Sequence, residues 1–183
     1  MSKILVFLAN GFEEIEALTP VDLCRRAGME VTCVSINDTV EVTGARGISV
    51  NADITLKDAD FDSADMLILP GGMPGTNNLN ECEPLMAKVD EFIKAGRNVS
   101  AICAAPSVIL GKRGYLKGKK GCCYPGMEDG LVETNVSYDS VAVDGNLITA
   151  RGMGCAIDFS LAIIEKLDSK ETADKIAKSV VYR

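Results

Sequence analysis

The stretch Asn98-Val-Ser-Ala-Ile-Cys-Ala-Ala-Pro-Ser-Val-Ile-Leu110 joins a short apolar strand to a helix. Small residues on both sides of Cys103 allow the close approach of strand and helix that a sharp turn requires, and Pro106 suits a first helical turn. A cysteine at such an elbow stands above the sheet edge and faces the free amides of the helix start. We therefore expect a lowered pKa for the Cys103 thiol, within a fold built from strands that lead into helices.

Short apolar runs alternate with amphipathic stretches along the whole chain. The predicted strands cover residues 4–9, 30–35, 66–69, 98–102, 121–124, 140–143 and 147–149, and the predicted helices cover residues 12–27, 82–95, 104–111, 156–167 and 169–180. Residues 40–56 predict a hairpin or an edge excursion around Gly44 and Gly47. Strands that alternate with helices over short connections predict one α/β domain over residues 1–183, with a mostly parallel sheet and helices on both faces.

Composition and charge exclude several classes of protein. The net charge of −7 repels nucleic acid and anionic lipid. The N-terminal apolar run, residues 4–9, is too short for a secretion signal, and no run approaches the ~20 apolar residues of a membrane span. An odd number of cysteines, seven, without a CxxC pair or any histidine, argues against a disulfide framework or a structural metal site. We expect a cytoplasmic protein with no nucleic-acid, membrane or metal partner.

Because the chain contains no histidine, no Cys–His pair can activate Cys103. The carboxyl ends of parallel strands meet at one edge, and glycine-rich or charged segments occur there at residues 10–16, 70–76, 102–106 and 151–154. Glu16 is the candidate partner, since a carboxyl beside Cys103 in a partly dry crevice has a raised pKa and can transfer a proton. The amides of Gly71, Gly72 and Ala104 are candidates for an oxyanion site.

Each of these features also has an ordinary structural interpretation. Free cysteine is among the most buried residue types, so Cys103 alone would be read as a structural thiol. Glutamates in a first helical turn, such as Glu13, Glu14 and Glu16, commonly complement the helix dipole. The turn Pro70-Gly71-Gly72 can simply end a strand. The convergence of several such segments at one sheet edge is what favours a functional site.

Four ordered motifs resemble the ThiJ/PfpI superfamily, and within it the branch of a human parkinsonism-associated redox protein and its bacterial relatives. The motifs are Glu14-Ile-Glu16, Leu69-Pro-Gly-Gly72, Ala101-Ile-Cys-Ala-Ala-Pro106 and Ala150-Arg-Gly-Met-Gly154, and the match runs from Lys3 to about Val180. The resemblance implies a flavodoxin-like three-layer sandwich with a cysteine elbow, assembled as a homodimer. It implies that Cys103 is reactive, that Glu16 is its protonated partner and that Gly72 and Ala104 supply oxyanion amides. Gly71, Tyr124 and Arg151 are supporting candidates.

The resemblance further implies an enzyme without a cofactor that acts on small reactive aldehydes or glycated protein groups, as a glutathione-independent glyoxalase or a protein deglycase. The same residues suit a non-enzymatic oxidative-stress sensor or redox-regulated chaperone, in which Cys103 is oxidised to a sulfenic and then a sulfinic acid. A PfpI-type peptidase is the third interpretation. Many relatives have a histidine where this chain has Tyr124, and a phenol with a pKa of ~10 is a poor base, which weakens that interpretation.

Overall fold

A seven-stranded sheet forms the centre of the protein, in a computed structural model that describes residues 1–182. The strand order is β10-β11-β7-β6-β1-β2-β5, and β10 is the strand that runs antiparallel to its neighbour. The strands are β1 (Lys3–Leu8), β2 (Glu30–Ser35), β5 (Ile54–Thr55), β6 (Met66–Leu69), β7 (Asn98–Ile102), β10 (Val141–Asp144) and β11 (Leu147–Ala150). The predicted parallel sheet is therefore confirmed, and its central strands are the short apolar runs of the sequence.

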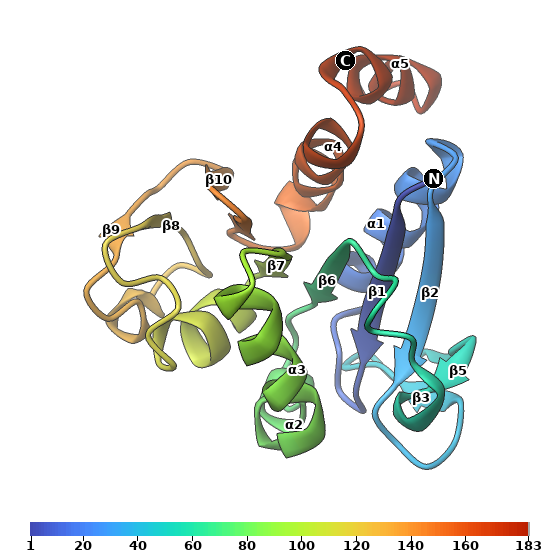
Figure 1. Cartoon of the computed structure of the whole chain (residues 1–183), viewed down its shortest axis with the longest axis horizontal. Coiled ribbons are helices and arrows are strands. Elements are labelled where there is room, and N and C mark those ends of the chain that lie inside the picture. The colour runs from blue at the N-terminus through green and yellow to red at the C-terminus, as the bar shows by residue number, and fades with distance from the viewer. Residues whose placement is uncertain (183) are drawn as a thin grey trace.

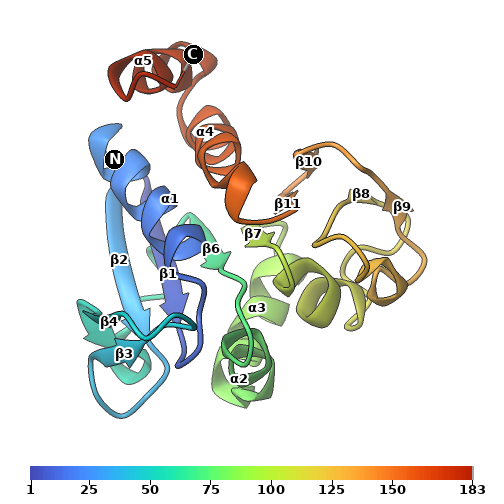
Figure 2. The ribbon, with the colours of Figure 1, turned by 180° about the vertical axis from the view of Figure 1, so that it is seen from behind.

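Helices cover both faces of this sheet (Figures 1 and 2). One face is covered by α1 (Glu14–Arg26) and α4 (Ala156–Leu167), and the other by α2 (Gly75–Glu81), α3 (Glu83–Lys94) and the short helix η2 (Pro106–Gly111), while α5 (Lys170–Ser179) follows α4. The arrangement is the expected three-layer α/β sandwich. Helix α5 packs on α4 at one end of the molecule, the end at which the N-terminus also lies.

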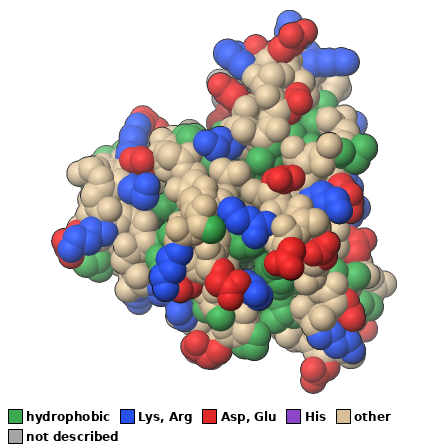
Figure 3. All heavy atoms as spheres, in the orientation of Figure 1, with side chains coloured by type: hydrophobic (Ala, Val, Ile, Leu, Met, Phe, Trp, Pro, Cys, Tyr) green, Lys and Arg blue, Asp and Glu red, His purple; other side chains and the backbone are tan. Residues whose placement is uncertain are grey.

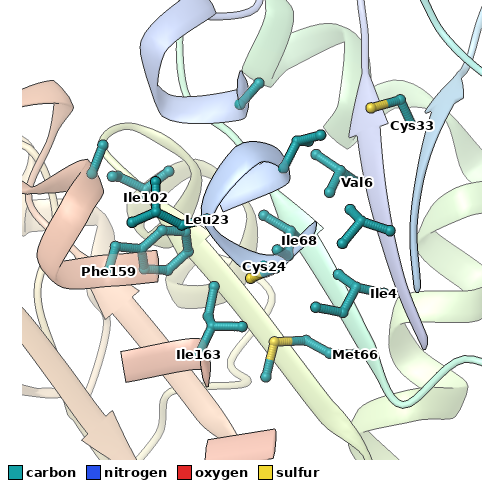
Figure 4. Packing of buried hydrophobic residues seen from close by; sticks show 14 of the residues in the cluster. Ile4, Val6, Leu23, Cys24, Cys33, Met66, Ile68, Ile102, Phe159 and Ile163 are labelled. Atoms are coloured by element: carbon teal, nitrogen blue, oxygen red, sulfur yellow. The ribbon is translucent and has the colours of Figure 1, made fainter. Parts of the chain in front are cut away.

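Alternate side chains of β1 enter two separate apolar cores, as the pleat of a strand covered on both faces requires. Val6 belongs to the core beneath α1 and α4, where it lies with Cys24 and Phe159 (Figure 4). Phe7 belongs to the core beneath α3. Cys24 is fully buried, as the sequence predicts, and burial raises the pKa of its thiol to about 12, which keeps it unreactive.

The predicted excursion at residues 40–56 is a hairpin, in which β3 (Glu41–Thr43) pairs antiparallel with β4 (Ser49–Asn51). A second tight turn joins β10 to β11 at Gly145, where a φ of 59° suits glycine. The last helix begins where the sequence indicates, because the Ser169 side chain accepts a hydrogen bond from the Thr172 amide as an N-cap.

The local structure differs from the expected elements in three places. The predicted strand at residues 121–124 is reduced to β8 (Lys120–Gly121), paired with β9 (Asn135–Val136), because the Cys122 amide donates to Thr149 Oγ1 at 2.9 Å. Helix α2 has no counterpart among the predicted elements. The helix predicted at residues 104–111 begins later, as η2, and is wound with wider π-type hydrogen bonds.

The surface mixes both signs of charge. Figure 3 shows basic and acidic side chains interspersed over the face that it presents. The run Lys117-Gly-Lys-Lys120 concentrates positive charge, and ion pairs of Lys117 with Glu133 and of Lys120 with Asp139, each at 2.7 Å, offset it. Within residues 1–182, no helix combines the length and the apolar character needed to cross a membrane.

Candidate active site

Cys103 is held in a strained backbone conformation immediately after β7. Its φ of 66° lies in the left-handed region, which a residue with a side chain rarely adopts. The Cys103 amide donates to the carbonyl of Ala150 at 2.9 Å, and its own carbonyl accepts from the amide of Tyr124 at 2.8 Å. Both backbone groups are thereby fixed, and the half-buried thiol is presented at the edge of the sheet. Strain that is imposed by such surroundings is typical of functional positions.

Glu16 is placed beside this thiol by the first turn of α1. The carboxylate of Glu13 caps the helix by accepting a hydrogen bond from the Glu16 amide at 2.7 Å. The Glu16 side chain is buried, with 1% of the residue exposed, and its Oε2 accepts from the Gly71 amide at 3.1 Å. The carboxyl also bonds to the Cys103 thiol and accepts from the backbone of Met153. Glu16 thus connects the segments that follow β1, β6, β7 and β11.

The two glycines after β6 leave no room for side chains. A Cβ at Gly71 would overlap the Glu16 carboxylate and the Cβ of Cys103, and a Cβ at Gly72 would overlap the backbone of Glu13. The amides of Gly72 and Ala104 are hydrogen-bonded to the Cys103 sulfur. The structure therefore gathers the predicted residues Cys103, Glu16, Gly71, Gly72 and Ala104 around one point.

The Glu16 carboxyl has a raised pKa, in the direction expected from the sequence. Burial raises this pKa to about 7, and the neighbouring charge of Glu13 adds to the effect. Hydrogen bonds from Cys103, Gly71 and Met153 act in the opposite direction without cancelling it. Glu16 consequently gains or loses its proton near neutral pH, as a proton-transfer group should.

The lowered pKa expected for Cys103 is wrong. Burial and the adjacent charge of Glu16 raise the pKa of the thiol to about 12, and the opposing hydrogen bonds from the amides of Ala104 and Gly72 are weaker. When the pair holds a single proton, that proton resides on sulfur and the carboxylate accepts its hydrogen bond. Such a pair can serve as a nucleophile with an adjacent base, rather than as a standing thiolate.

A cleft of about 510 Å³ opens over Cys103, and Tyr124 lines it with its ring beside Gly152. Arg151, in contrast, is not among the residues that line the cleft. Its guanidinium carbon lies 6.0 Å from the centre of the Tyr138 ring, and its Nη1 donates to the Tyr138 carbonyl at 3.3 Å. The structure therefore brings Tyr124 to the site but not Arg151.

Other residues at the cleft were not anticipated. Glu14 is buried, and its Oε1 accepts from the Arg46 amide at 2.8 Å, which fastens the turn of the β3–β4 hairpin to the start of α1. Ala45 and Arg46 reach the cleft in this way, and three methionines, 73, 127 and 153, also line it. Because these residues belong to loops and turns, no periodic pattern marks them in the sequence. The buried carboxyl group of Glu14 thus does more than complement a helix dipole.

A profile of the DJ-1/PfpI family matches residues 2–166. The chain belongs to this family. Protein dj-1beta of Drosophila melanogaster is 40% identical over an alignment of 185 positions, which covers 99% of this chain and 98% of that protein. The Caenorhabditis elegans protein named glutathione-independent glyoxalase DJR-1.2 is 31% identical over 97% of this chain and 94% of its own length.

Solved DJ-1 structures share the fold over the whole chain. Oxidized Toxoplasma gondii DJ-1 superposes with a TM-score of 0.96 at 37% identity, covering 100% of this chain and 99% of that one. Some curated relatives are longer. The chain spans 42% and 46% of the DJ-1 homologs B and A of Arabidopsis thaliana, and each is 37% identical to it.

Proposed function

We propose that this DJ-1/PfpI protein is a cysteine-dependent stress-response enzyme that acts on reactive 2-oxoaldehydes, as a glyoxalase or deglycase. One observation carries the proposal: the buried Glu16 carboxyl is hydrogen-bonded to the Cys103 thiol, while two amides are hydrogen-bonded to the same sulfur. A base, a nucleophile and anion-stabilising donors are thereby combined without histidine or metal. The worm relative that is named a glyoxalase supports this assignment.

In the first step, the Cys103 sulfur attacks the aldehyde carbon while the Glu16 carboxylate removes the thiol proton. A carbon–sulfur bond forms, and the carbonyl electron pair moves onto oxygen. We expect the amides of Gly72 and Ala104, which donate to the sulfur in the free protein, to donate to this oxyanion. Transfer of the proton from Glu16 to the oxygen completes a hemithioacetal.

In the second step, Glu16 removes the hydrogen on the former aldehyde carbon as a proton while the adjacent ketone oxygen gains a proton, which gives an enediol. Glu16 then returns its proton to the adjacent carbon, and the hydroxyl proton of the sulfur-bearing carbon is released as its carbonyl forms. The product is a thioester of a 2-hydroxy acid on Cys103. Water then breaks the carbon–sulfur bond, releasing the hydroxy acid and restoring the thiol. One water is consumed and no oxidant is needed. In the deglycase reaction, the 2-oxoaldehyde is attached to a protein amine or thiol. Its two reacting carbons then meet Cys103 and Glu16 in the same way.

Consumption of methylglyoxal and formation of lactate test this proposal. In Cys103→Ala, both rates should fall to the uncatalysed background. Cys82→Ala is the matched control, because Cys82 is also half-buried but lines a different cavity, and its rates should equal those of the wild type. Full turnover by Cys103→Ala would overturn the assignment.

A second function is favoured by the oxidized state in which the Toxoplasma relative was solved. The half-buried Cys103 sulfur already has the amide donors that a sulfinate would need, and a protonated Glu16 could donate to such a product. Intact mass after mild peroxide treatment tests this redox-sensor role. Two oxygens should be added at Cys103, and preferential oxidation of any other cysteine would count against it.

We also propose that the protein forms a homodimer through an apolar groove of about 980 Å³ beside α1. Exposed apolar side chains gather there, with 48% of Ile15 and 91% of Val181 accessible. Leu18 also lines the groove, on the same helix as the charged residues Glu14, Asp22 and Arg26. Exposed patches of this kind mark interaction sites. A second copy is the natural occupant, because two identical apolar faces match each other across a two-fold axis.

A further inference from the structure

The methionines of this chain divide into two groups. Of seven methionines, three are buried in the core, namely Met29, Met66 and Met86, and Met1 is the first residue. The remaining three, Met73, Met127 and Met153, all line the cleft over Cys103. Met73 and Met153 are about half accessible, at 50% and 51%. Met73 and Met153 are therefore exposed at the candidate active site, and the partly buried Met127 packs against the core beneath α3 and also lines the cleft.

These three methionines come from three separate segments. Met73 follows the glycine pair after β6, Met127 lies in the loop after Tyr124, and Met153 precedes α4. The ring of Tyr124 and the methyl group of Ala45 also line the cleft, so much of its wall is apolar. Methionine is flexible and polarizable, and it adapts to apolar groups of different shape. Such a wall suits an apolar substituent of the substrate rather than the polar aldehyde group itself.

The cleft is also larger than the smallest 2-oxoaldehydes require. Methylglyoxal has five heavy atoms and occupies at most roughly 150 Å³, taking the ~30 Å³ of a water molecule for each atom. The cleft has about 510 Å³. After the reacting carbons are placed at Cys103, most of the volume is left for the substituent of the substrate.

We propose that the cleft selects 2-oxoaldehydes with a bulky apolar substituent, and that Met73 and Met127 contact this substituent. The inference rests on the proposed function, and it names the substrate class of the same site. The reacting carbons and the steps at Cys103 and Glu16 are unchanged. Selectivity comes from apolar surface that the substituent removes from water against the methionine side chains.

Comparison of three glyoxals, with methyl, isobutyl and carboxyethyl substituents, tests the proposal. The three additional carbons of isobutylglyoxal should raise kcat/KM about tenfold over methylglyoxal, mainly through a lower KM. Carboxyethylglyoxal is the rival, because Arg46 also lines the cleft and could pair with a carboxylate. Equal kcat/KM values for the methyl and isobutyl compounds, or preference for the anionic one, would overturn the proposal and leave the proposed function standing.

Variants at Met73 and Met127 show whether these side chains cause the preference. The double variant Met73→Ser/Met127→Ser should bring the isobutyl-to-methyl ratio of kcat/KM close to one. Met73→Leu/Met127→Leu is the matched control, because it keeps an apolar wall of similar volume, and it should retain the ratio. Met153 is left unchanged because it also lines the groove of the proposed dimer, so that its substitution could alter assembly as well. An unchanged ratio in the serine variant would contradict the assignment.

A binding measurement separates failure of this inference from failure of the proposed function. The rate at which iodoacetamide alkylates Cys103, followed by intact mass, reports whether the cleft is occupied. The isobutyl analogue of lactate should protect Cys103 at about tenfold lower concentration than lactate, although both carry the same carboxylate. Protection without turnover of any aldehyde would overturn the proposed function alone. Equal protection by the two acids would overturn the selectivity.

Discussion

Among single residues, Glu16 is the one on whose ionisation the proposed chemistry depends. Burial holds its pKa near 7, and its hydrogen bond to the Cys103 thiol means that only the ionised carboxyl can accept the thiol proton. The fraction of ionised Glu16 rises with pH through about 7. The protonation state of one buried side chain thus determines whether the nucleophile is activated.

The first prediction is a pH profile. With methylglyoxal as substrate, kcat/KM should rise about tenfold per pH unit below pH 7 and level off above it, because the general base must be ionised in the free enzyme. Initial rates at limiting substrate over about pH 5 to 9 provide the measurement. A profile that is flat, or that falls through this range, would show that another group controls the reaction.

The second prediction concerns stability. Because the folded state raises the pKa of Glu16 from 4.5 to about 7, the folded protein binds more protons than the unfolded chain between these values. The contribution of Glu16 to stability is present below about pH 4.5 and is lost as the pH rises through 7. From pH 5 to 8, the free energy of unfolding of the wild type should fall relative to Glu16→Gln by up to about 3 kcal/mol. Urea unfolding at both pH values measures the difference, and a constant difference would contradict a raised pKa.

At the scale of elements, the start of α1 combines a structural and a functional task. Glu13 caps the helix by accepting the amide of Glu16, and so the cap fixes the backbone of the proposed base. Ser169 caps α5 in the same way, by accepting the amide of Thr172, but α5 does not reach the cleft. The two caps form a natural matched pair.

The third prediction uses this pair. Glu13→Ala and Ser169→Ala should each lower the free energy of unfolding by about 1 kcal/mol, because each removes a cap acceptor. Only Glu13→Ala should also lower kcat/KM for methylglyoxal, since it releases the backbone of Glu16. Urea unfolding and steady-state kinetics of both variants make the comparison. Equal activity of the two variants would show that the α1 cap does not position the base.

The elements that the sequence predicts best are those with a simple physical signal. Strands β2, β6 and β7 have the predicted bounds, because each is a short apolar run between turn residues. Helix α2 was missed because Gly75 and its polar neighbours suggest a turn, and helix formation there depends on packing of Leu79 into the core. The strand expected at residues 121–124 fails because a side chain, Thr149, binds the Cys122 amide.

The features of the candidate site also differ in how far the sequence could predict them. Cys103, Glu16 and Gly72 could be predicted because each follows a predicted strand, and parallel strands end at one edge. The direction in which the Cys103 pKa shifts could not be predicted. It depends on whether burial and the charge of Glu16, which raise the pKa, outweigh the hydrogen bonds from two amides, which lower it. The methionines of the cleft lie in irregular segments, where only the folded chain shows which side chains meet.

At the scale of the whole molecule, the groove beside α1 and the cleft share one residue. Met153 lines both, and its backbone bonds to Glu16, so a partner in the groove would lie next to the proposed active site. Assembly and activity would then be linked through the segment before α4. An interface at this face would also remove the exposed apolar surface from water.

The fourth prediction is the oligomeric state. Light scattering after size exclusion should give twice the chain mass of 19.4 kDa for the wild type. Leu18→Glu should dissociate the dimer, because it places a charge in the apolar groove. Val143→Glu is the control, since Val143 is also apolar and exposed, at 50% against 37% for Leu18, but lies on β10. A monomeric wild type, or a dimer that survives Leu18→Glu, would contradict the proposed interface.

In the proposed mechanism, the Glu16 carboxyl does for Cys103 what a histidine does in many cysteine enzymes. The most direct test is the rate of hydroxy acid formation from methylglyoxal by Glu16→Gln, with alkylation of Cys103 by iodoacetamide confirming that the thiol remains accessible. We expect a loss of at least about 100-fold in kcat/KM at pH 8, with Cys103 still fully alkylated. A rate within twofold of the wild type would contradict this mechanism.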